Sequence, residues 1–415
     1  MKLGKFSIGV GDRFSHQGKA QLRAIMKANE TGLEINPVWN KSNREHTYVH
    51  SEPIDTRREA DEAVKALGYN GQYFVDADHI NLSTVDRFVA VSDFFTLDVA
   101  SFIGKPSAQE DIDTFIASCE KYLGELQIPG MEKPLSITKE LLEDIANKFL
   151  SATQQASEIY AYLVDKKGVG NFITEVSMDE VEKPQTPVEM LFILKMLADK
   201  GVPAQTIAPK FTGRFNKGVD YVGNLEQFAK EFEEDVLVID FAVKEFGLPA
   251  ELKLSVHSGS DKFSIYPIMA EVINRHDKGL HLKTAGTTWL EEVIGLAKAD
   301  GEGLVLAKKI YANSLNRKDE LCAPYADVID IDGSKLPAIE EVNSWDSEKY
   351  QNTLRHIPGN PDYNANFRQL IHVAYAVASE LGKEYTDLLE KYEDIVGGCV
   401  EENIYERHLK RLFSL

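Results

Sequence analysis

The stretch YFVDADH (Tyr73–His79) joins a short apolar run directly to a cluster of acidic and imidazole side chains. Its apolar part has the length of a β-strand, and Asp76, Asp78 and His79 follow where that strand would end. The same arrangement recurs along the chain. Six further apolar runs of strand length lead into polar or glycine-rich residues: Phe6–Val10, Ile35–Trp39, Asn171–Ile173, Ala204–Ile207, Leu252–Val256 and Leu280–Leu282.

Helical patterns follow most of these runs, at Arg57–Leu67, Pro187–Lys200, Leu225–Phe246 and Trp289–Ala299. Such alternation predicts βαβ units and a parallel sheet in an α/β protein. We predict a closed, TIM-like (β/α)8 barrel, with the eighth strand near Thr353–Ile357. Parallel sheets gather their catalytic residues at the C-terminal ends of the strands, so the residues after each run are the candidates for function.

Two regions depart from this alternation. Residues 92–165 are mostly helical in pattern and too long for a simple connection, so we expect a helical insertion there. Residues 360–415 contain clear helical patterns, as at Asn366–Leu381 and Tyr385–Tyr392, which predict a helical C-terminal extension. Since no low-complexity linker interrupts the chain, residues 1–415 are expected to form one catalytic domain.

The charge balance restricts the partners. The 415 residues include 46 Lys and Arg against 66 Asp and Glu, a formal net charge of −20. This excess of acid argues against a nucleic acid and against an anionic membrane surface, although a local basic pocket can still bind a small anion. No segment has about 18 continuous apolar residues, so no membrane span is expected. The sequence leaves open whether the chain forms a homo-oligomer.

The cysteines and the N-terminal segment indicate the compartment. The three cysteines, Cys119, Cys322 and Cys399, are far apart and form no CxxC pair. A disulfide framework or a thiolate zinc site is therefore not expected, and a reducing compartment fits. The opening residues MKLGKFSIGVGDRF lack the long apolar stretch of a signal peptide. We expect a cytoplasmic protein.

The cluster at the end of the Tyr73 run is the strongest candidate for chemistry. In a strand, Asp76 and Asp78 point to one side, but the chain turns where the strand ends, so Asp78 and His79 can approach the same ligand. The functional interpretation makes His79 a metal ligand and Asp78 a general base. The alternative is an ordinary helix cap or turn, where Asp is common.

The segment VHSGSDK (Val256–Lys262) is the second candidate. His257 closes an apolar run and is predicted to bind a metal ion, while Ser258 offers donors to an oxyanion. Asp261 and Lys262 are candidates for contact with substrate. The alternative is a simple βα loop with a hydrogen-bonded histidine.

His281 and Lys283 lie two residues apart, so a strand places both side chains on one face. His281 is either a third metal ligand or a core histidine. Lys283 either pairs with an anion or forms a Schiff base after burial lowers its pKa. Glu175 is a candidate second acid or base, because epimerisation can use proton-transfer groups on opposite sides of a substrate. The alternative for Glu175 is a helix start.

Basic residues also gather near the predicted strand ends. In so acidic a chain they suit a carboxylate substrate, since Arg can grip a carboxylate through two hydrogen bonds. Lysines usually lie on solvated faces, so each one alone is weak evidence. The basic set is Arg13, Lys41, Arg44, Lys210, Arg214, Lys262 and Lys283, and His356 is a weaker candidate in a rigid loop. The chain carries no P-loop, no dinucleotide fingerprint and no GxSxG motif.

Long segments of the chain resemble the tagaturonate epimerase family. They are GVGDRFSHQGKAQLRA (Gly9–Ala24), NKSNREH (Asn40–His46), VDADHI (Val75–Ile80), TVDRF (Thr84–Phe88), SDFFTLDVA (Ser92–Ala100), APKFTGRFNKGVDY (Ala208–Tyr221), SVHSGSDKFSIYP (Ser255–Pro267) and HLKTAGTTWLEE (His281–Glu292). The resemblance implies a metal-dependent barrel epimerase of hexuronate catabolism that interconverts D-tagaturonate and D-fructuronate. The substrate would then be a small anionic sugar acid.

The resemblance also implies roles for individual residues. It makes Asp78 the proton acceptor, Glu175 the proton donor, and His79, His257 and His281 the ligands of a divalent cation. Imidazole ligands beside carboxylates suit zinc, manganese, cobalt or nickel. Substrate contacts are expected from Lys41, Arg44, Lys210, Arg214, Ser258, Asp261, Lys262 and Lys283.

The chemistry leaves two routes and two other functions open. The inverted carbon would be C4 and the ketone C2, so the C4 hydrogen is not acidified directly. A metal-assisted retro-aldol route, which breaks and re-forms the C3–C4 bond, avoids this problem, and direct proton transfer at carbon is the other route. The competing functions are a Schiff-base or metal-dependent aldolase or isomerase of a related sugar acid, and a sugar-acid sensor without catalysis.

Overall fold

The predicted barrel is confirmed in a computed structural model, which describes residues 1–284 and 286–415; Ala285, within the HLKTAGTTWLEE segment, lies outside the described residues. Eight parallel strands close in the order β1-β10-β9-β8-β7-β4-β3-β2. The strands are β1 (Phe6–Gly11), β2 (Ile35–Ser42), β3 (Phe74–Ile80), β4 (Phe94–Asp98), β7 (Ile173–Ser177), β8 (Thr206–Ala208), β9 (Lys253–His257) and β10 (Leu280–Lys283). All the carboxyl ends of these strands therefore open at the same mouth.

The position predicted for the eighth strand is wrong. Thr353 and Leu354 end the helix α13 (Ser347–Leu354), in which Tyr350 and Leu354 are buried with helical spacing. The missing strand is β4, at Phe94–Asp98, inside the range expected to be helical. Its first four residues are buried, as in other strands covered on both faces, and the long helical pattern that follows hides this short run.

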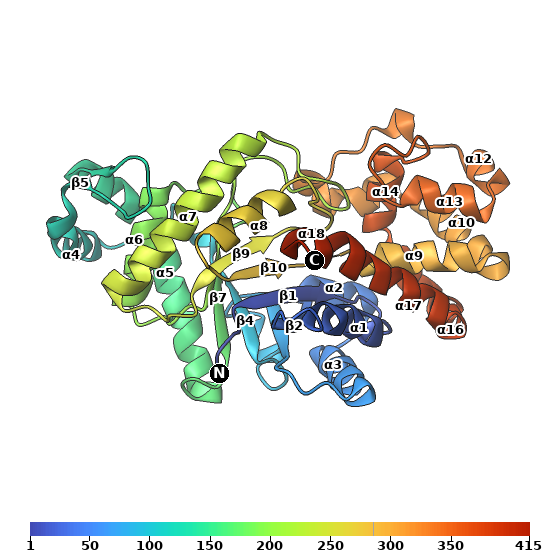
Figure 1. Cartoon of the computed structure of the whole chain (residues 1–415), viewed down its shortest axis with the longest axis horizontal. Helices are drawn as coiled ribbons and strands as arrows, with labels where there is room; N and C mark the ends of the chain where they lie inside the picture. Colours follow the sequence, from blue (N-terminus) through green and yellow to red (C-terminus); the bar gives the residue numbers. More distant parts are fainter. Residues whose placement is uncertain (285) are drawn as a thin grey trace.

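The residues between β4 and β7 form an excursion beside the barrel. It contains α4 (Gln109–Cys119), a hairpin of β5 (Gly124–Leu126) and β6 (Leu135–Ile137), and the long α5 (Lys139–Lys167). In Figure 1, α4 and β5 lie at the end of the molecule opposite the C-terminal helices. Its long helix α5 reaches the connection between β3 and β4, where Tyr162 bonds Asp86 and Lys167 donates to Val89 O at 2.9 Å.

The remaining barrel helices follow their strands as the alternation predicted. Local signals set their ends: Thr186 and Glu189 form a reciprocal capping box at the start of α6, and Ser42 and Glu45 form another at the start of α2. These helices are α1 (Gly18–Asn29), α2 (Asn43–Val49), α3 (Pro53–Leu67), α6 (Pro187–Asp199), α7 (Leu225–Phe246) and α8 (Tyr266–Arg275).

The chain after β10 is helical, which confirms the predicted C-terminal extension. Its helices build a second apolar cluster around Trp289, Tyr311 and Phe367, beside the cluster that surrounds the barrel. The helices are α9 (Thr288–Ala299), α10 (Gly301–Asn316), α11 (Lys318–Cys322), α12 (Ile339–Ser344), α13, α14 (Ala365–Val373), α15 (Tyr375–Leu381), α16 (Lys383–Lys391), α17 (Glu393–Glu402) and α18 (Lys410–Phe413). In Figure 1, α17 returns beside α1 and α9.

Side chains inside the barrel are arranged in layers. Val38, Phe74, Phe94 and Ile173 form a small apolar cluster with Leu3 in the lower half of the barrel. Two residues further along three of these strands stand Asp76, Thr96 and Glu175, so the interior becomes polar toward the mouth. Within the described residues, no helix has both the length and the apolar character needed to cross a membrane.

Candidate active site

A local irregularity at the end of β3 brings His79 into the mouth of the barrel. The pairing of β3 with β4 shifts between Ala77 and Ile80, and His79 adopts a left-handed conformation with φ of 50°. A bulge of this kind re-aims a side chain that strict alternation would turn away from Asp78. The His79 ring lies 3.8 Å from Asp78 Oδ1 and 3.6 Å from Asp98 Oδ2.

Lys283 is the centre of a buried charge cluster. Its Nζ lies 2.8 Å from Asp76 Oδ2, 2.8 Å from Asp78 Oδ1 and 3.1 Å from Glu175 Oε1. Burial alone would lower the pKa of Lys283, but Asp76 and the other two carboxylates raise it well above its usual value. Lys283 is therefore a fixed ammonium group that pairs with anions of the protein itself.

The three carboxylates around Lys283 differ in their protonation. Burial would raise the pKa of Glu175, but Lys283 and His257 lower it well below its ordinary value. The hydroxyl of Thr206 also donates to Glu175 at 2.7 Å. For Asp76, burial outweighs Lys283 and raises the pKa to about 7. These surroundings favour the ionised form of Glu175, and Asp76 is the carboxyl group that is protonated most readily.

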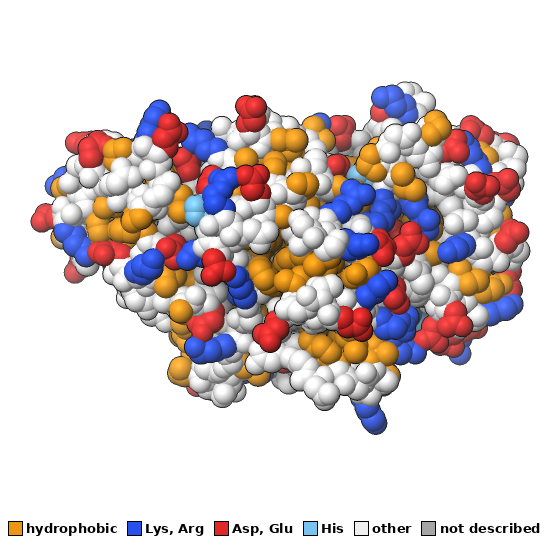
Figure 2. All heavy atoms as spheres, viewed as in Figure 1, with side chains coloured by type: hydrophobic (Ala, Val, Ile, Leu, Met, Phe, Trp, Pro, Cys, Tyr) orange, Lys and Arg blue, Asp and Glu red, His pale blue; other side chains and the backbone are white. Residues whose placement is uncertain are grey.

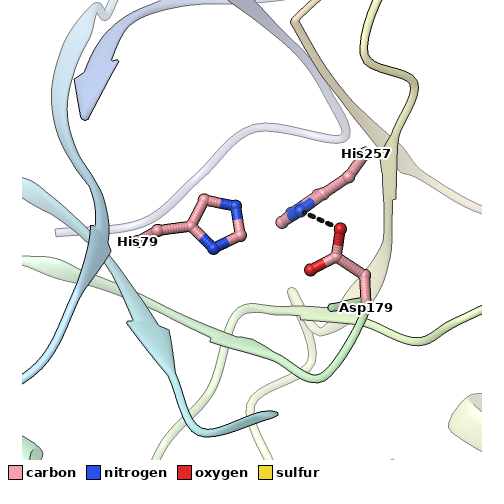
Figure 3. Close-up of side chains that lie close together, drawn as sticks. All are labelled: His79, Asp179 and His257. Atoms are coloured by element: carbon pink, nitrogen blue, oxygen red, sulfur yellow. Dashed lines mark ion pairs between the residues drawn. The ribbon is translucent and has the colours of Figure 1, made fainter. Parts of the chain in front are cut away.

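A second cluster, next to Lys283, has the composition of a metal centre. One ligand atom each from His79, Asp179 and His257 lies within 4.8 Å of the others, and Figure 3 shows these side chains facing one another. His257 Nδ1 is 3.1 Å from Asp179 Oδ2, and its Nε2 is 2.9 Å from Glu175 Oε1. Asp98 and a neighbouring acid, Glu180, form a similar group with His79.

The donor set fits a divalent cation. Nδ1 of His79 and Nδ1 of His257 are buried, and within the described residues each faces a carboxylate, Asp98 at 3.6 Å and Asp179 at 3.1 Å, without the geometry of a hydrogen bond. Burial would lower the pKa of His79, but Asp78 and neighbouring acids raise it to about 10, and Asp179 and Glu175 raise that of His257 to about 9 against the same opposition. The surrounding carboxylates therefore favour protonation of both imidazoles. The resulting two positive charges equal the charge of a divalent cation, which would replace the two protons on binding.

His281 does not join either group. Its ring lies deeper in the barrel, 5.4 Å from Phe94, and its Nδ1 is 2.8 Å from Ser7 Oγ. The side chain is fully buried, and burial lowers its pKa to about 3, so the ring is neutral. Because it precedes Lys283 by two residues, His281 lies one layer below the mouth. Of the three predicted ligands, the structure brings together His79 and His257.

Asp179 is the residue that the sequence interpretation missed. The apolar pattern predicts a strand that ends at Ile173, whereas β7 continues to Ser177. Glu175 is therefore inside the strand, and Asp179 follows the strand end, where the hydroxyl of Ser177 donates to it at 2.6 Å. The rule that functional residues follow strand ends would have identified Asp179 had the strand been given its full length.

Several predicted substrate contacts hold loops instead. Lys41, 1% exposed, donates to Arg13 O at 3.0 Å. Lys262 is fully buried and donates to the carbonyls of Asn216 and Val219 at 2.9 and 2.7 Å. The hydroxyl of Ser258 lies 3.0 Å from Lys283 O. These contacts shape the loops after β1, β8 and β10 around the mouth.

Asp261 is also structural in its contacts. It is fully buried and accepts hydrogen bonds from Arg368 at 2.8 Å, from His356 at 3.2 Å and from His408 at 3.1 Å. Arg368, in α14, further donates to Gly218 O at 2.6 Å. These bonds join the loops after β8 and β9 to the C-terminal helices. They also place His356 against Asp261.

The other predicted contacts are more exposed. Arg44 is exposed, and its Cζ lies 5.9 Å from the centroid of the Tyr325 ring, while Arg214 is exposed with an ion pair to Asp330 at 3.0 Å. Lys210 is half-buried just after β8, where its backbone N–H donates to Gln185 at 2.8 Å.

The comparison with known sequences assigns the family. A sequence model described as tagaturonate epimerase matches residues 1–412. The chain belongs to the tagaturonate epimerase family. A curated member, the tagaturonate/fructuronate epimerase of Thermotoga maritima, is 30% identical over 423 residues, which cover 98% of this chain and 80% of that protein. Family membership makes this chain an isomerase-class enzyme, a carbohydrate epimerase, as predicted, and not a binding protein without catalysis.

Crystal structures of family members support the fold. A glycerol complex of the fructuronate-tagaturonate epimerase of Cohnella laeviribosi matches with a TM-score of 0.81 at 23% identity, over 99% of this chain and 82% of that one. The native form of the same enzyme matches with a TM-score of 0.79 at 22% identity, with the same coverage. The tagaturonate epimerase fold therefore extends over nearly the whole chain, including the C-terminal helices.

Proposed function

We propose that this enzyme interconverts D-tagaturonate and D-fructuronate, with a divalent cation held by His79, His257 and Asp179. The names of the relatives supply the substrate pair. One observation carries the metal site: two imidazoles and a carboxylate from the ends of three strands converge within 4.8 Å. Such a donor set suits zinc, manganese, cobalt or nickel. Bound there, the cation would act as a Lewis acid on the substrate ketone.

Asp78 is the proposed base. Burial would raise its pKa, but Lys283 and His79 lower it, so the carboxylate is ionised and able to accept a proton. In the retro-aldol route, Asp78 takes the proton of the C4 hydroxyl, a C4 carbonyl forms, and the C3–C4 bonding electrons move onto the C2 ketone. The aldehyde then turns its other face, the bond re-forms, and Asp78 returns the proton to the C4 oxygen.

The contacts of Glu175 favour this route over proton transfer at carbon. Inversion by direct transfer requires a proton donor on the face opposite the base. Glu175 Oε1 lies 3.1 Å from Lys283 and 2.9 Å from His257, and Oε2 accepts from Thr206 at 2.7 Å, so both of its oxygens are engaged within the protein, which disfavours Glu175 as that donor. The retro-aldol route uses one group, Asp78, for both removal and return. Glu175 then serves to orient His257 and to balance the charge of Lys283.

The Schiff-base alternative is disfavoured by the state of Lys283. Imine formation needs a neutral amine, which burial or a neighbouring cation normally provides. Here three carboxylates surround the ammonium and raise its pKa well above the usual value. Borohydride in the presence of substrate is therefore expected to leave Lys283 unmodified, and a covalent adduct at Lys283 by mass spectrometry would favour the aldolase.

Removal of the metal tests the proposal directly. The protein is stripped with a chelator, its metal content is measured, and D-tagaturonate is followed to D-fructuronate by NMR. We expect activity to be lost in the stripped protein and restored by one or more of zinc, manganese, cobalt and nickel. Full activity in a metal-free protein would eliminate the role of the cation.

The cysteines support a cytoplasmic location for the reaction. Cys119, Cys322 and Cys399 are all free thiols, and Cys119 and Cys399 are buried. Free thiols are typical of proteins in a reducing compartment. We infer that the enzyme acts on a small sugar acid in the cytoplasm.

A further inference from the structure

We propose that Arg13 and Lys217 bind the carboxylate of the substrate, and that Tyr325 and Tyr375 of the C-terminal helices pack against these two cations. The inference rests on the proposed function and deepens it, because it names the groups that would distinguish a sugar acid from a neutral sugar. On the face shown in Figure 2, Lys and Arg side chains gather where the C-terminal helices meet the barrel.

The four side chains come from separate segments that meet over the mouth. Arg13 follows β1, whereas Lys217 lies in the loop after β8, and β9 and β10 separate these two strands in the barrel. Tyr325 lies in a short 3-10 helix (Ala323–Val328), and Tyr375 begins α15. The backbone N–H of Lys217 donates to Val328 O at 2.8 Å, which fixes the β8 loop to the C-terminal region.

The tyrosine pair holds the two cations in place. The hydroxyls of Tyr325 and Tyr375 are 2.6 Å apart. Arg13 Cζ lies 4.5 Å from the centroid of the Tyr375 ring, and Lys217 Nζ lies 5.9 Å from that of Tyr325. Cation–π contact of this kind orients a cation without neutralising it, so the guanidinium and the ammonium keep their capacity to bind an anion.

The positive charge in this subsite is only partly balanced. Arg13 Nη2 pairs with Glu45 at 3.2 Å, but its Nε is buried without a hydrogen bond in the described part of the chain. Lys217 forms no ion pair with any described residue. Burial, and then the charge of Arg13, lower the pKa of Lys217 against the opposing effect of Glu45. Arg44, whose Cζ also lies 5.9 Å from the centroid of the Tyr325 ring, adds a third cation, so the positive charges around the tyrosine pair exceed the one carboxylate of Glu45 and favour an anionic ligand.

His372 supplies a neutral neighbour to the two cations. It is 5% exposed, and its Nδ1 forms no hydrogen bond among the described residues. Burial lowers its pKa well below the usual value, and Arg13 and Lys217 lower it further. A Cβ on Gly218, next to Lys217, would lie 3.4 Å from this Nδ1. A neutral imidazole at this point can bond a sugar hydroxyl without competing for the carboxylate.

The subsite lies on the same side of the barrel as the catalytic groups. Glu45, which pairs with Arg13, accepts a hydrogen bond from the backbone N–H of Ser42 at 3.1 Å, and Ser42 is the register partner of Asp78 across β2 and β3. Asp78 is the proposed base. A sugar acid whose carboxylate is held by Arg13 and Lys217 therefore extends its carbon chain toward Asp78. Arg is suited to this role because its planar fork grips a carboxylate through two bonds.

Binding of an unreactive sugar acid tests the subsite without catalysis. Isothermal titration of the metal-loaded full chain with D-gluconate is compared for the wild type, Arg13→Met and Lys217→Met. Loss of a charged hydrogen bond is expected to raise the Kd about 10- to 100-fold in each variant. Lys217→Arg should retain most of the affinity. Lys230→Met, which removes an exposed cation of α7, serves as the matched control.

A neutral probe and the kinetics complete the test. Binding of D-glucitol, which lacks the carboxylate, should differ little between the wild type and the variants. With D-tagaturonate, KM should rise in Arg13→Met and Lys217→Met by a factor similar to that for D-gluconate, while kcat changes less than about threefold. Circular dichroism and metal content establish that each variant is folded and loaded.

The outcomes separate the two proposals. A wild type that binds D-gluconate through Lys217 but does not epimerise D-tagaturonate would overturn the proposed function and support the subsite. A wild type that epimerises, with folded variants whose D-gluconate affinity equals its own, would overturn the subsite alone. Equal losses of affinity for D-gluconate and for D-glucitol would also overturn the subsite, because the two cations would then not recognise the carboxylate.

Discussion

Lys283 Nζ lies 2.8 Å from Asp78 Oδ1. The proposed base on β3 is thus paired with a buried ammonium group on β10, and β1 and β2 lie between these two strands in the barrel. The ion pair keeps Asp78 ionised inside the barrel, where burial alone would protonate it. It also fixes the carboxylate at the edge of the His79–His257–Asp179 group. The catalytic state of Asp78 therefore depends on a residue more than 200 positions away in the sequence.

Replacement of Asp78 by Asn should abolish turnover. The amide keeps the shape of the side chain but cannot accept the hydroxyl proton, and a positioned base is worth on the order of 100-fold or more. Metal content should remain close to that of the wild type, because Asp78 is not one of the three proposed ligands. NMR rates for the Asp78→Asn variant, with the exposed Asp113→Asn as control, measure the effect. A residual rate above about a tenth of the wild-type rate contradicts the assignment.

Substitution of the histidines should separate ligands from core residues. His79→Ala and His257→Ala each remove one of the three proposed ligands, so metal affinity should fall by a factor on the order of 100 or more. His281→Asn should leave the metal content unchanged, because that ring bonds Ser7 one layer below.

Elemental analysis after dialysis against a weak chelator provides the measurement for all three histidine variants. Loss of metal from His281→Asn, in a protein that remains folded, would show that His281 belongs to the centre. Retention of metal by both His79→Ala and His257→Ala would remove the centre itself.

The Asp261–Arg368 ion pair should contribute strongly to stability. Both side chains are fully buried and lie 2.8 Å apart, so Arg368→Leu leaves the Asp261 carboxylate without its main partner. Breaking a buried pair from one side costs about 3–5 kcal/mol. Urea unfolding measures this loss. The double variant Asp261→Leu/Arg368→Leu should recover part of it, and an Arg368→Leu variant as stable as the wild type contradicts the role.

The pH dependence of stability should carry a contribution from His46. This side chain is 1% exposed, and burial, with Lys41 and Arg87, lowers its pKa to about 3. Since its unfolded pKa is about 6.5, the unfolded chain binds the extra proton between these values. The contribution is therefore complete above pH 6.5 and is lost as the pH falls toward 3.

At pH 5 the loss from His46 amounts to about 2 kcal/mol of unfolding free energy. Denaturant unfolding between pH 7 and pH 5 should show a steeper decline for the wild type than for His46→Gln, which cannot take up the proton. Equal slopes for the two proteins would exclude this contribution.

Much of the fold followed from local patterns. Seven of the eight strands begin or end near the predicted apolar runs, because strands buried on both faces read as short continuous apolar segments. β4 was not predicted, because Phe94–Asp98 is a short run that is followed by a long helical pattern. The eighth strand was instead placed at Thr353–Ile357, where the buried residues in fact continue the spacing of α13.

The candidate site was predictable in part. Asp78, His79 and His257 were predicted because each follows an apolar run, and they meet at the mouth because they lie at the carboxyl ends of β3 and β9. Asp179 was missed because β7 continues to Ser177, whereas the predicted apolar run ends at Ile173. No sequence pattern predicted a role for Lys217. Its position depends on the loop after β8, which a hydrogen bond to Val328 joins to the C-terminal region.

The amino-acid sequence by itself determined the order of strands and helices, the excess of acid, and the kinds of side chain that stand at the strand ends. The tertiary structure alone decided which of them share a site. Two residues along a strand move a side chain by roughly 6.6 Å, enough to place His281 below the buried charge cluster at the mouth and Lys283 within that cluster. That depth is set by how the strands are staggered when the barrel closes, and stagger arises from contacts between distant segments, which no local pattern records.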